Sequence, residues 1–134
     1  MKTIIVALAL VCSCTIVHAA EIDFSAPVLS VDGKPFKDCG AFADDGKCTQ
    51  IINMTLGKFA AGVLNSRGDD RNLSFQQIVE RGTLARRLFN GGKQNVDASE
   101  IKLIEDMAAK SSYAPLLVVN AIMMIDPDAL KKQK

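Results

Sequence analysis

The sequence predicts a mainly α protein, a small bundle of about four short helices preceded by an N-terminal extended arm or β-ribbon. From Thr55 onwards, apolar residues recur at the three- and four-residue spacing of a helix, and most runs begin with a capping residue. Residues 21–54 instead combine glycines, prolines and short apolar runs, which are typical of turns and ribbons. A chain of 134 residues is expected to form one domain. Residues 21–54 and 55–134 should therefore share one core.

Residues 1–20 have the pattern of a secretory signal peptide. Lys2 precedes an uncharged run over residues 3–17, and two alanines then come directly before Glu21. The run is too short for a membrane-spanning helix, which needs about 20 apolar residues. We expect cleavage near Ala20, with the mature chain in the periplasm or secreted and without a transmembrane span.

Two alternatives to a cleaved signal keep the chain attached to a membrane. Val11-Cys12-Ser13-Cys14 loosely resembles a bacterial lipoprotein cleavage box, which would anchor the protein by a lipid on Cys14. The same N-terminal segment could also be retained as a signal anchor. In all three cases the folded part of the chain faces outward.

Composition excludes several classes of function. The formal net charge of the chain is +1, and Lys2 is the only charged residue of the signal, so the remainder is neutral and lacks the basic surface that nucleic acids require. The single histidine, His18, also lies in the signal. Without it, Ser-His-Asp and Cys-His catalysis are impossible in the mature chain. We therefore expect no catalytic residue, no cofactor and no metal site.

Three of the expected helices carry clear start or stop signals. Thr55 is placed to cap the first, Ser74 and Gln77 form a capping-box pattern for the second, and Asp97 with Glu100 repeats that pattern for the third. Gly68 is expected to stop the first helix and Gly91-Gly92 the second. The expected apolar stripe of the second helix consists of Phe75, Ile78, Val79, Ala85, Leu88 and Phe89.

The fourth expected helix, Pro115 to Ile125, is apolar on nearly all sides. Such a helix is typical of the centre of a bundle. Its length is too short to cross a bilayer. We therefore expect it to lie at the centre of the core.

The arm before the helices is expected to begin as a small ribbon. Val28–Val31 reads as a short strand, Asp32-Gly33 as a tight turn and Lys34–Phe36 as the return. The apolar residues of this arm that we expect to pack on the bundle are Phe24, Val28, Leu29 and Phe36.

Cys39 and Cys48 are the two cysteines that follow the signal, and we expect them to form a disulfide with each other. Exported chains usually fold where thiols are oxidised. The spacing differs from the Cys-x-x-Cys pattern of thiol oxidoreductases, so a redox activity is not expected. Two free thiols or an intermolecular bridge are the alternatives.

The cysteine loop is the candidate interaction site. A loop closed by a disulfide is pre-organised, which lowers the ordering cost of binding. The alternative is that its phenylalanine folds onto the helices and that the loop is inert. Its aspartates lack the spacing of a calcium-binding loop, so no calcium site is expected. The candidate interaction residues are Asp38, Phe42, Asp44, Asp45 and Lys47.

Three short motifs have a functional and a structural interpretation. Asn53-Met54-Thr55 and Asn72-Leu73-Ser74 fit the N-glycosylation pattern, which matters only in a eukaryotic secretory pathway; Thr55 and Ser74 are also expected helix caps. Arg67-Gly68-Asp69 is the tripeptide that integrins recognise, but a solvated helix end explains it better.

Several segments resemble a group of small phage and prophage proteins of unassigned function. These are the Asp32-Gly33-Lys34-Pro35 turn, the Thr55-Leu56-Gly57 helix start and the Tyr113–Leu116 segment that opens the last helix. The export signal and the cysteine-bearing insert depart from the group's pattern. The resemblance implies phage origin and, as one reading, a structural or assembly component of a phage particle. It implies no chemistry.

The function that the sequence predicts is therefore an exported, non-enzymatic protein that binds an unidentified protein partner in the periplasm or outside the cell. A carboxylate-dependent hydrolase acting on the envelope is the alternative from another class, because export alone makes it conceivable. Its candidate carboxylates are Asp44, Asp45, Glu80, Glu100 and Glu105.

Overall fold

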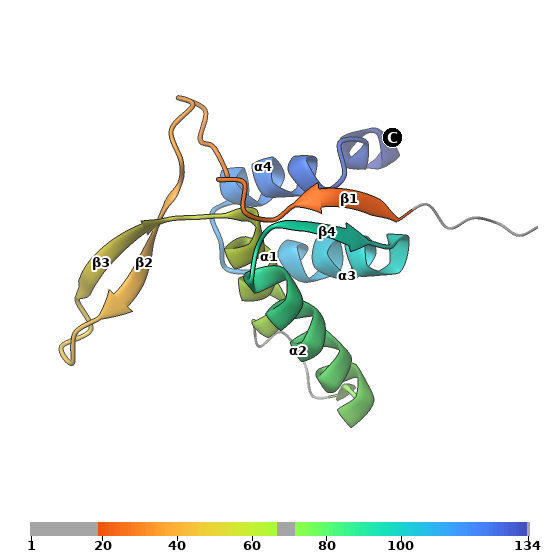
Figure 1. The fold of residues 1–134 in the computed structure, drawn as a ribbon, viewed down its shortest axis with the longest axis horizontal. Coiled ribbons are helices and arrows are strands. Elements are labelled where there is room, and N and C mark those ends of the chain that lie inside the picture. Colours follow the sequence, from red (N-terminus) through yellow and green to blue (C-terminus); the bar gives the residue numbers. More distant parts are fainter. Residues whose placement is uncertain (1–18, 67–71, 134) are drawn as a thin grey trace, which may run out of the picture.

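The computed structural model describes residues 19–66 and 72–133. Within them, four α-helices and two antiparallel two-stranded sheets are present, together with a 3₁₀ helix near the C-terminus (Figure 1). The elements are β1 (Ala20–Asp23), β2 (Lys37–Phe42), β3 (Cys48–Asn53), α1 (Leu56–Asn65), α2 (Phe75–Phe89), β4 (Lys93–Val96), α3 (Ala98–Ala109), α4 (Pro115–Ile125) and η2 (Ala129–Gln133). About half of the described residues are helical, so the fold is mixed α/β rather than mainly α.

Some predictions lie outside the described residues. The signal peptide over residues 1–20 and the lipid anchor on Cys14 fall almost wholly within residues 1–18. Gly68, with the tripeptide that contains it, falls within residues 67–71. Ala20 is the first residue of β1, so cleavage after it would shorten that strand by one residue.

The first three helices begin where the capping signals placed them. The Thr55 hydroxyl accepts a hydrogen bond from the Lys58 backbone N–H. Capping boxes form at Ser74 and at Asp97. In each, the side chain of the cap accepts a hydrogen bond from the backbone N–H three residues later, and the side chain of that later residue accepts one from the backbone N–H of the cap. The fourth helix runs from Pro115 to Ile125 as predicted. A helix cap depends on residues within three positions of each other, so it can be predicted from the sequence.

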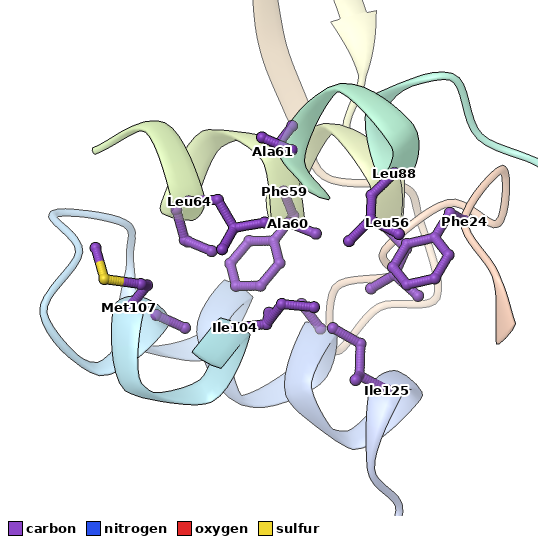
Figure 2. Packing of buried hydrophobic residues seen from close by; sticks show 14 of the residues in the cluster. Phe24, Leu56, Phe59, Ala60, Ala61, Leu64, Leu88, Ile104, Met107 and Ile125 are labelled. Atoms are coloured by element: carbon purple, nitrogen blue, oxygen red, sulfur yellow. The ribbon is translucent and has the colours of Figure 1, made fainter. Parts of the chain in front are cut away.

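The centre of the core is α1, which contacts α2, α3 and α4. Phe59 and Leu64 point from α1 toward Ile104 of α3, and Leu56 lies beside Phe24 and Leu88 (Figure 2). The buried residues of α1 are Leu56, Gly57, Phe59, Ala60, Ala61, Val63 and Leu64.

The prediction that α4 lies at the centre of the core is wrong. Leu117, Ala121 and Ile125 are buried, but Leu116, Val119 and Met123 on the same helix are partly exposed. The physical reason lies in α1, whose glycines and alanines let three neighbours approach closely. Helix α4 has larger side chains and packs against one side of this helix group. Its other side therefore faces outward.

Small residues of α1 set how closely its neighbours pack. A Cβ added to Gly57 would lie 2.3 Å from the carbonyl oxygen of Leu88 and 3.0 Å from that of Phe24. The Gly57 N–H donates to the Phe24 carbonyl at 2.9 Å. A Cβ at Gly62 would instead meet the Tyr113 hydroxyl, the end of a side chain that packs on Phe59. The backbones of α2 and of the N-terminal segment therefore meet α1 at Gly57.

Arg81 fixes α2 against the end of α1. Its side chain is buried, and its guanidinium Nη2 donates to the carbonyl oxygens of Leu64 at 2.7 Å and Ser66 at 3.1 Å. These carbonyls belong to the last turn and the cap of α1, where helix carbonyls lack partners within the helix. A buried arginine thus replaces the missing helical hydrogen bonds.

The predicted apolar stripe of α2 is only partly buried. Ala85 and Leu88 lie in the core as expected, together with Leu84. Phe75, Ile78, Val79 and Phe89 are exposed instead. The buried face is rotated toward Arg81, and the N-terminal half of α2 projects beyond the other helices (Figure 1).

The predicted ribbon over residues 28–36 forms as a loose turn with antiparallel backbone hydrogen bonds, rather than as two regular strands. Residues 28–36 form an isolated bridge, Leu29 to Pro35, around a turn with Gly33 at φ +76°. Phe24 and Val28 are buried and Phe36 packs on the core, as expected, whereas Leu29 is exposed. The sheets form elsewhere: β1 pairs with β4, from Ala20 with Val96 to Asp23 with Lys93, and β2 pairs with β3.

We expect Gly57→Ala to destabilise the protein by about 3 kcal/mol, because a methyl group there forces two backbone segments apart. Gly62→Ala is the matched control, since the Tyr113 side chain can move and alanine gains about 1 kcal/mol of helix propensity. Chemical denaturation of both variants measures the difference. Equal stabilities would contradict the close packing at Gly57.

Candidate functional site

The predicted disulfide loop is a β-hairpin that projects from the helical body (Figure 1). Lys37 pairs with Asn53 at its base and Phe42 with Cys48 near its tip, with an irregular register between Cys39 and Phe42. Two backbone hydrogen bonds close the turn: Ala43 N–H donates to Lys47 at 2.8 Å, and Gly46 N–H to Ala43 at 2.9 Å. Gly46 has φ +79°, which glycine adopts without strain.

The structure confirms the Cys39–Cys48 disulfide. The two Cα atoms are 5.7 Å apart, within the usual range for a disulfide. The bridge joins β2 to β3 and closes the outer half of the hairpin into a ring. A disulfide of this kind is typical of proteins that fold in an oxidising compartment outside the cytoplasm.

The candidate interaction residues of this loop lie in two places. Phe42 is 67% exposed near the tip, so the alternative in which it folds onto the helices is wrong. Asp44, Asp45 and Lys47 form the turn, where the Lys47 ammonium lies 2.7 Å from the Asp45 carboxylate. This hydrogen bond lowers the pKa of Asp45. Asp38 lies at the base of the hairpin instead, where it pairs with Ile52.

Ile51, on β3, is an exposed apolar residue of the hairpin that the sequence analysis missed. Its side chain is 72% exposed. The β-branched residues Thr49, Ile51 and Ile52 were a usable signal for a strand, but they do not say which strand face is left uncovered.

A hollow of about 300 Å³ separates the base of the hairpin from the helices. Gly40 and Ile52 border it on the hairpin side, Ala61 and Gly62 on α1, and Phe89 at the end of α2. The sequence analysis did not identify this hollow, because its walls come from segments far apart in the chain.

A second groove, of about 530 Å³, runs along α2 and adjoins this hollow. Ala61, Asn65 and Phe89 border both spaces. Val79, Gly82 and Arg86 of α2 form the rest of its wall, together with neighbouring small side chains. Of the exposed apolar residues of α2, Val79 and Phe89 border this shallow depression.

The candidate carboxylates for hydrolysis lie on different elements. Glu80 accepts a hydrogen bond from Gln76 on α2, and Glu100 bonds both the Asp97 backbone and the Arg87 guanidinium, the latter at 2.8 Å. Asp44 and Asp45 are on the hairpin turn. Glu80 and Glu100 border a common hollow of about 280 Å³ together with Arg87, whereas Asp44, Asp45 and Glu105 do not border it.

Glu105 has an environment that disfavours its charge. Burial is the main cause that raises its pKa, and the neighbouring Asp126 raises it further. No donor among the described residues bonds its buried Oε1. Asp126 pairs with Lys132 of η2, and this hydrogen bond lowers the Asp126 pKa. The Asp126–Lys132 pair links the end of α4 to η2.

The residues of the two glycosylation motifs have structural roles. Asn53 accepts a hydrogen bond from the Lys37 ammonium at 2.6 Å, and Thr55 and Ser74 cap α1 and α2 as expected. Asn72 is exposed just before α2. Glycosylation of Asn53 or Asn72 stays a prediction.

Across residues 19–66 and 72–133, no group of three or more histidine, cysteine, aspartate or glutamate side chains could hold a metal ion. In the same part of the chain, no helix is long and apolar enough to cross a membrane.

Comparisons with protein-family models, with curated proteins and with solved structures gave no match to this chain. The resemblance to phage and prophage proteins therefore stays a prediction. The arguments for function rest on the hairpin and on α2.

We expect replacement of both cysteines by serine to loosen the hairpin without unfolding the body. A disulfide that closes so short a ring contributes about 2.7 kcal/mol, or roughly 100-fold in the opening equilibrium. Hydrogen exchange of β2 and β3 amides should accelerate by up to that factor, while α1 amides keep their rates. Equal acceleration in α1 would show that the hairpin unfolds only with the whole protein.

Glu105→Gln should raise the melting temperature at pH 7 by about 2 °C. A raised carboxyl pKa means that folding favours the protonated form, so Glu105 costs stability as pH rises through and above its ordinary pKa of 4.5. At pH 3.5 the variant should therefore match the parent. Glu80→Gln, at an exposed position of α2, is the control. A pH-independent effect of Glu105→Gln would contradict this assignment.

Proposed function

We propose that this chain is an exported, non-enzymatic protein that binds another protein through the β2–β3 hairpin, in the periplasm or outside the cell. The observation that carries the proposal is the exposure of Phe42 and Ile51 on a projecting ribbon closed by a disulfide. Large apolar side chains on a projecting element are typical anchors of protein interfaces.

The hairpin has a second property that suits a partner protein. A sheet of only two strands leaves the outer backbone N–H and C=O groups of both strands unpaired within the sheet. A partner strand can add to such an edge by main-chain hydrogen bonds, while Phe42 or Ile51 fills a pocket on the partner. The mode of binding that we propose is therefore addition of a strand.

The disulfide supports the proposal through entropy. Binding by a flexible loop requires that the loop be ordered first, and the Cys39–Cys48 bridge removes much of that cost. The charges of the turn are largely paired, since Lys47 neutralises Asp45. Apolar contact and shape, rather than net charge, should therefore dominate binding.

The export step of the proposal rests on the signal pattern of residues 1–20 and on the disulfide. Phage origin, and a role as a structural or assembly component of a phage particle, rest on the resemblance alone. A carboxylate-dependent envelope hydrolase is supported less well. Glu80 and Glu100 border one hollow, but Glu100 is paired with Arg87, and the other candidate carboxylates lie elsewhere.

The test places a photo-crosslinking phenylalanine analogue at Phe42 in the exported protein. We expect one dominant adduct with a partner protein, lost when both cysteines are replaced by serine. The matched control puts the same analogue at Val31, which is 82% exposed on a different turn. The proposal fails if the two positions give the same adducts or if neither gives one.

Once the partner is identified, Phe42→Ser should weaken its binding at least tenfold, because buried aromatic anchors contribute about 2 kcal/mol or more. The melting temperature should stay within about 2 °C of the parent, since Phe42 is exposed. Val31→Ser is again the control. Turnover of an envelope substrate that disappears on an amide substitution at Glu105 or Glu100 would favour the hydrolase instead.

A further inference from the structure

The exposed face of α2 carries an apolar stripe that its own chain leaves uncovered. Phe75 is 81% exposed and Phe89 58%, and Ile78 and Val79 are about half exposed. Steps of about 100° per residue place Phe75, Val79, Gly82, Arg86 and Phe89 within roughly 80° of one another around the helix. The stripe is about 21 Å long. It is separate from the buried face that carries Arg81 and Leu88.

Gly82 lies in the middle of this stripe and has no role in packing within the chain. A Cβ added there would meet nothing within 4 Å, whereas at Gly57 and Gly62 it would meet a neighbour. Glycine in a helix interior costs about 1 kcal/mol relative to alanine. A close contact with another molecule would explain a glycine at this position.

The two phenylalanines at the ends of the stripe lie symmetrically about Gly82. Phe75 and Phe89 lie seven positions before and after it, and Ile78 and Arg86 lie four positions before and after it. If a second α2 crosses antiparallel at Gly82, Phe75 of each copy meets Phe89 of the other. Arg86 of each copy then lies opposite Ile78 and one turn from Phe75, where its guanidinium can stack on the ring. Such self-complementarity is the property of a two-fold interface.

The surface beside α2 has room for the second copy. The groove of about 530 Å³ runs along the stripe, and the adjoining hollow of about 300 Å³ lies next to Phe89. In the antiparallel arrangement, Phe75 of the partner enters this hollow between Ile52 and Gly62. The two Arg86 side chains start about 12 Å apart along the helices, so their charges repel little.

The area of the stripe is sufficient for a weak to moderate dimer. With about 200 Å² for a phenylalanine and less for the aliphatic residues, the exposed apolar parts amount to roughly 400 Å² per copy. Two copies bury roughly 800 Å² of apolar surface. The polar flanks around Thr83 and Gln76 bring the total near the lower bound of about 1,200 Å² for stable interfaces.

We infer that this protein forms a two-fold symmetric homodimer in which the α2 helices of two copies pack antiparallel and cross at Gly82. The inference is independent of the proposed function of the hairpin. The dimer would present two hairpins, one from each copy, to partner proteins.

A cysteine at the crossing point tests the register. In the two-fold dimer, Gly82→Cys places two thiols at the closest approach of the helices, where a disulfide can form. We expect a covalent dimer of the oxidised full chain on non-reducing electrophoresis. Glu80→Cys, on another face of α2, is the control and should stay monomeric on the gel. Absence of the Gly82→Cys bridge, or equal bridging at both positions, would overturn the inference.

Sedimentation equilibrium of the full chain tests the apolar contacts. Phe75→Ser and Phe89→Ser should each weaken dimerisation at least tenfold and by similar factors, because both remove the same two contacts. Phe42→Ser, an equally exposed aromatic on the hairpin, should leave the dimer unchanged while it weakens the binding of a hairpin partner. A monomer at all concentrations up to about 100 µM, or a dimer that resists Phe75→Ser, would overturn the inference.

Discussion

The rest of the structure depends on the close approach of three backbone segments at Gly57. Its N–H bonds the Phe24 carbonyl, and the Leu88 carbonyl lies where a side chain would begin. This contact brings the residue after β1 next to the end of α2, and therefore β1 next to β4, which follows α2 closely. Phe24 N–H then donates to Gly92 at 2.8 Å, and the two strands pair from that point. A single small residue thus connects the helical core to the β1–β4 sheet.

Because α1 occupies the centre, the protein has more apolar helical surface than its core can bury. The outer side of α4 and the exposed stripe of α2 are both left over. Neither is explained by folding, since exposed apolar side chains add nothing to the stability of an isolated chain. On α2, the exposed residues Phe75 and Phe89 lie symmetrically about Gly82, which packs against no other residue. This arrangement is the reason why we infer an interface there. No comparable symmetry is present on α4.

The hairpin and α2 both border one hollow, where Ile52 and Phe89 lie. Both are stiff elements: the hairpin is closed by the Cys39–Cys48 bridge, and α2 is anchored by Arg81 at the end of α1. Rigid projections position binding residues at low entropic cost. The formal net charge of the chain is only +1, so electrostatic attraction to polyanions is weak, and apolar projections fit the protein partner that we propose.

The sequence by itself determined the features that depend on neighbours in the chain. The starts of α1, α2 and α3 follow from Thr55, Ser74 and Asp97, whose caps act within three residues, and the Cys39–Cys48 bridge follows from the presence of only two cysteines after the signal. Tertiary structure alone decided the rest. Strand β1 pairs with residues 70 to 76 positions away, so no local pattern marked it. An amphipathic pattern also cannot say which of two apolar faces of a helix is buried. On α2, the face with Arg81 and Leu88 is buried because only that face meets the close-packed surface of α1.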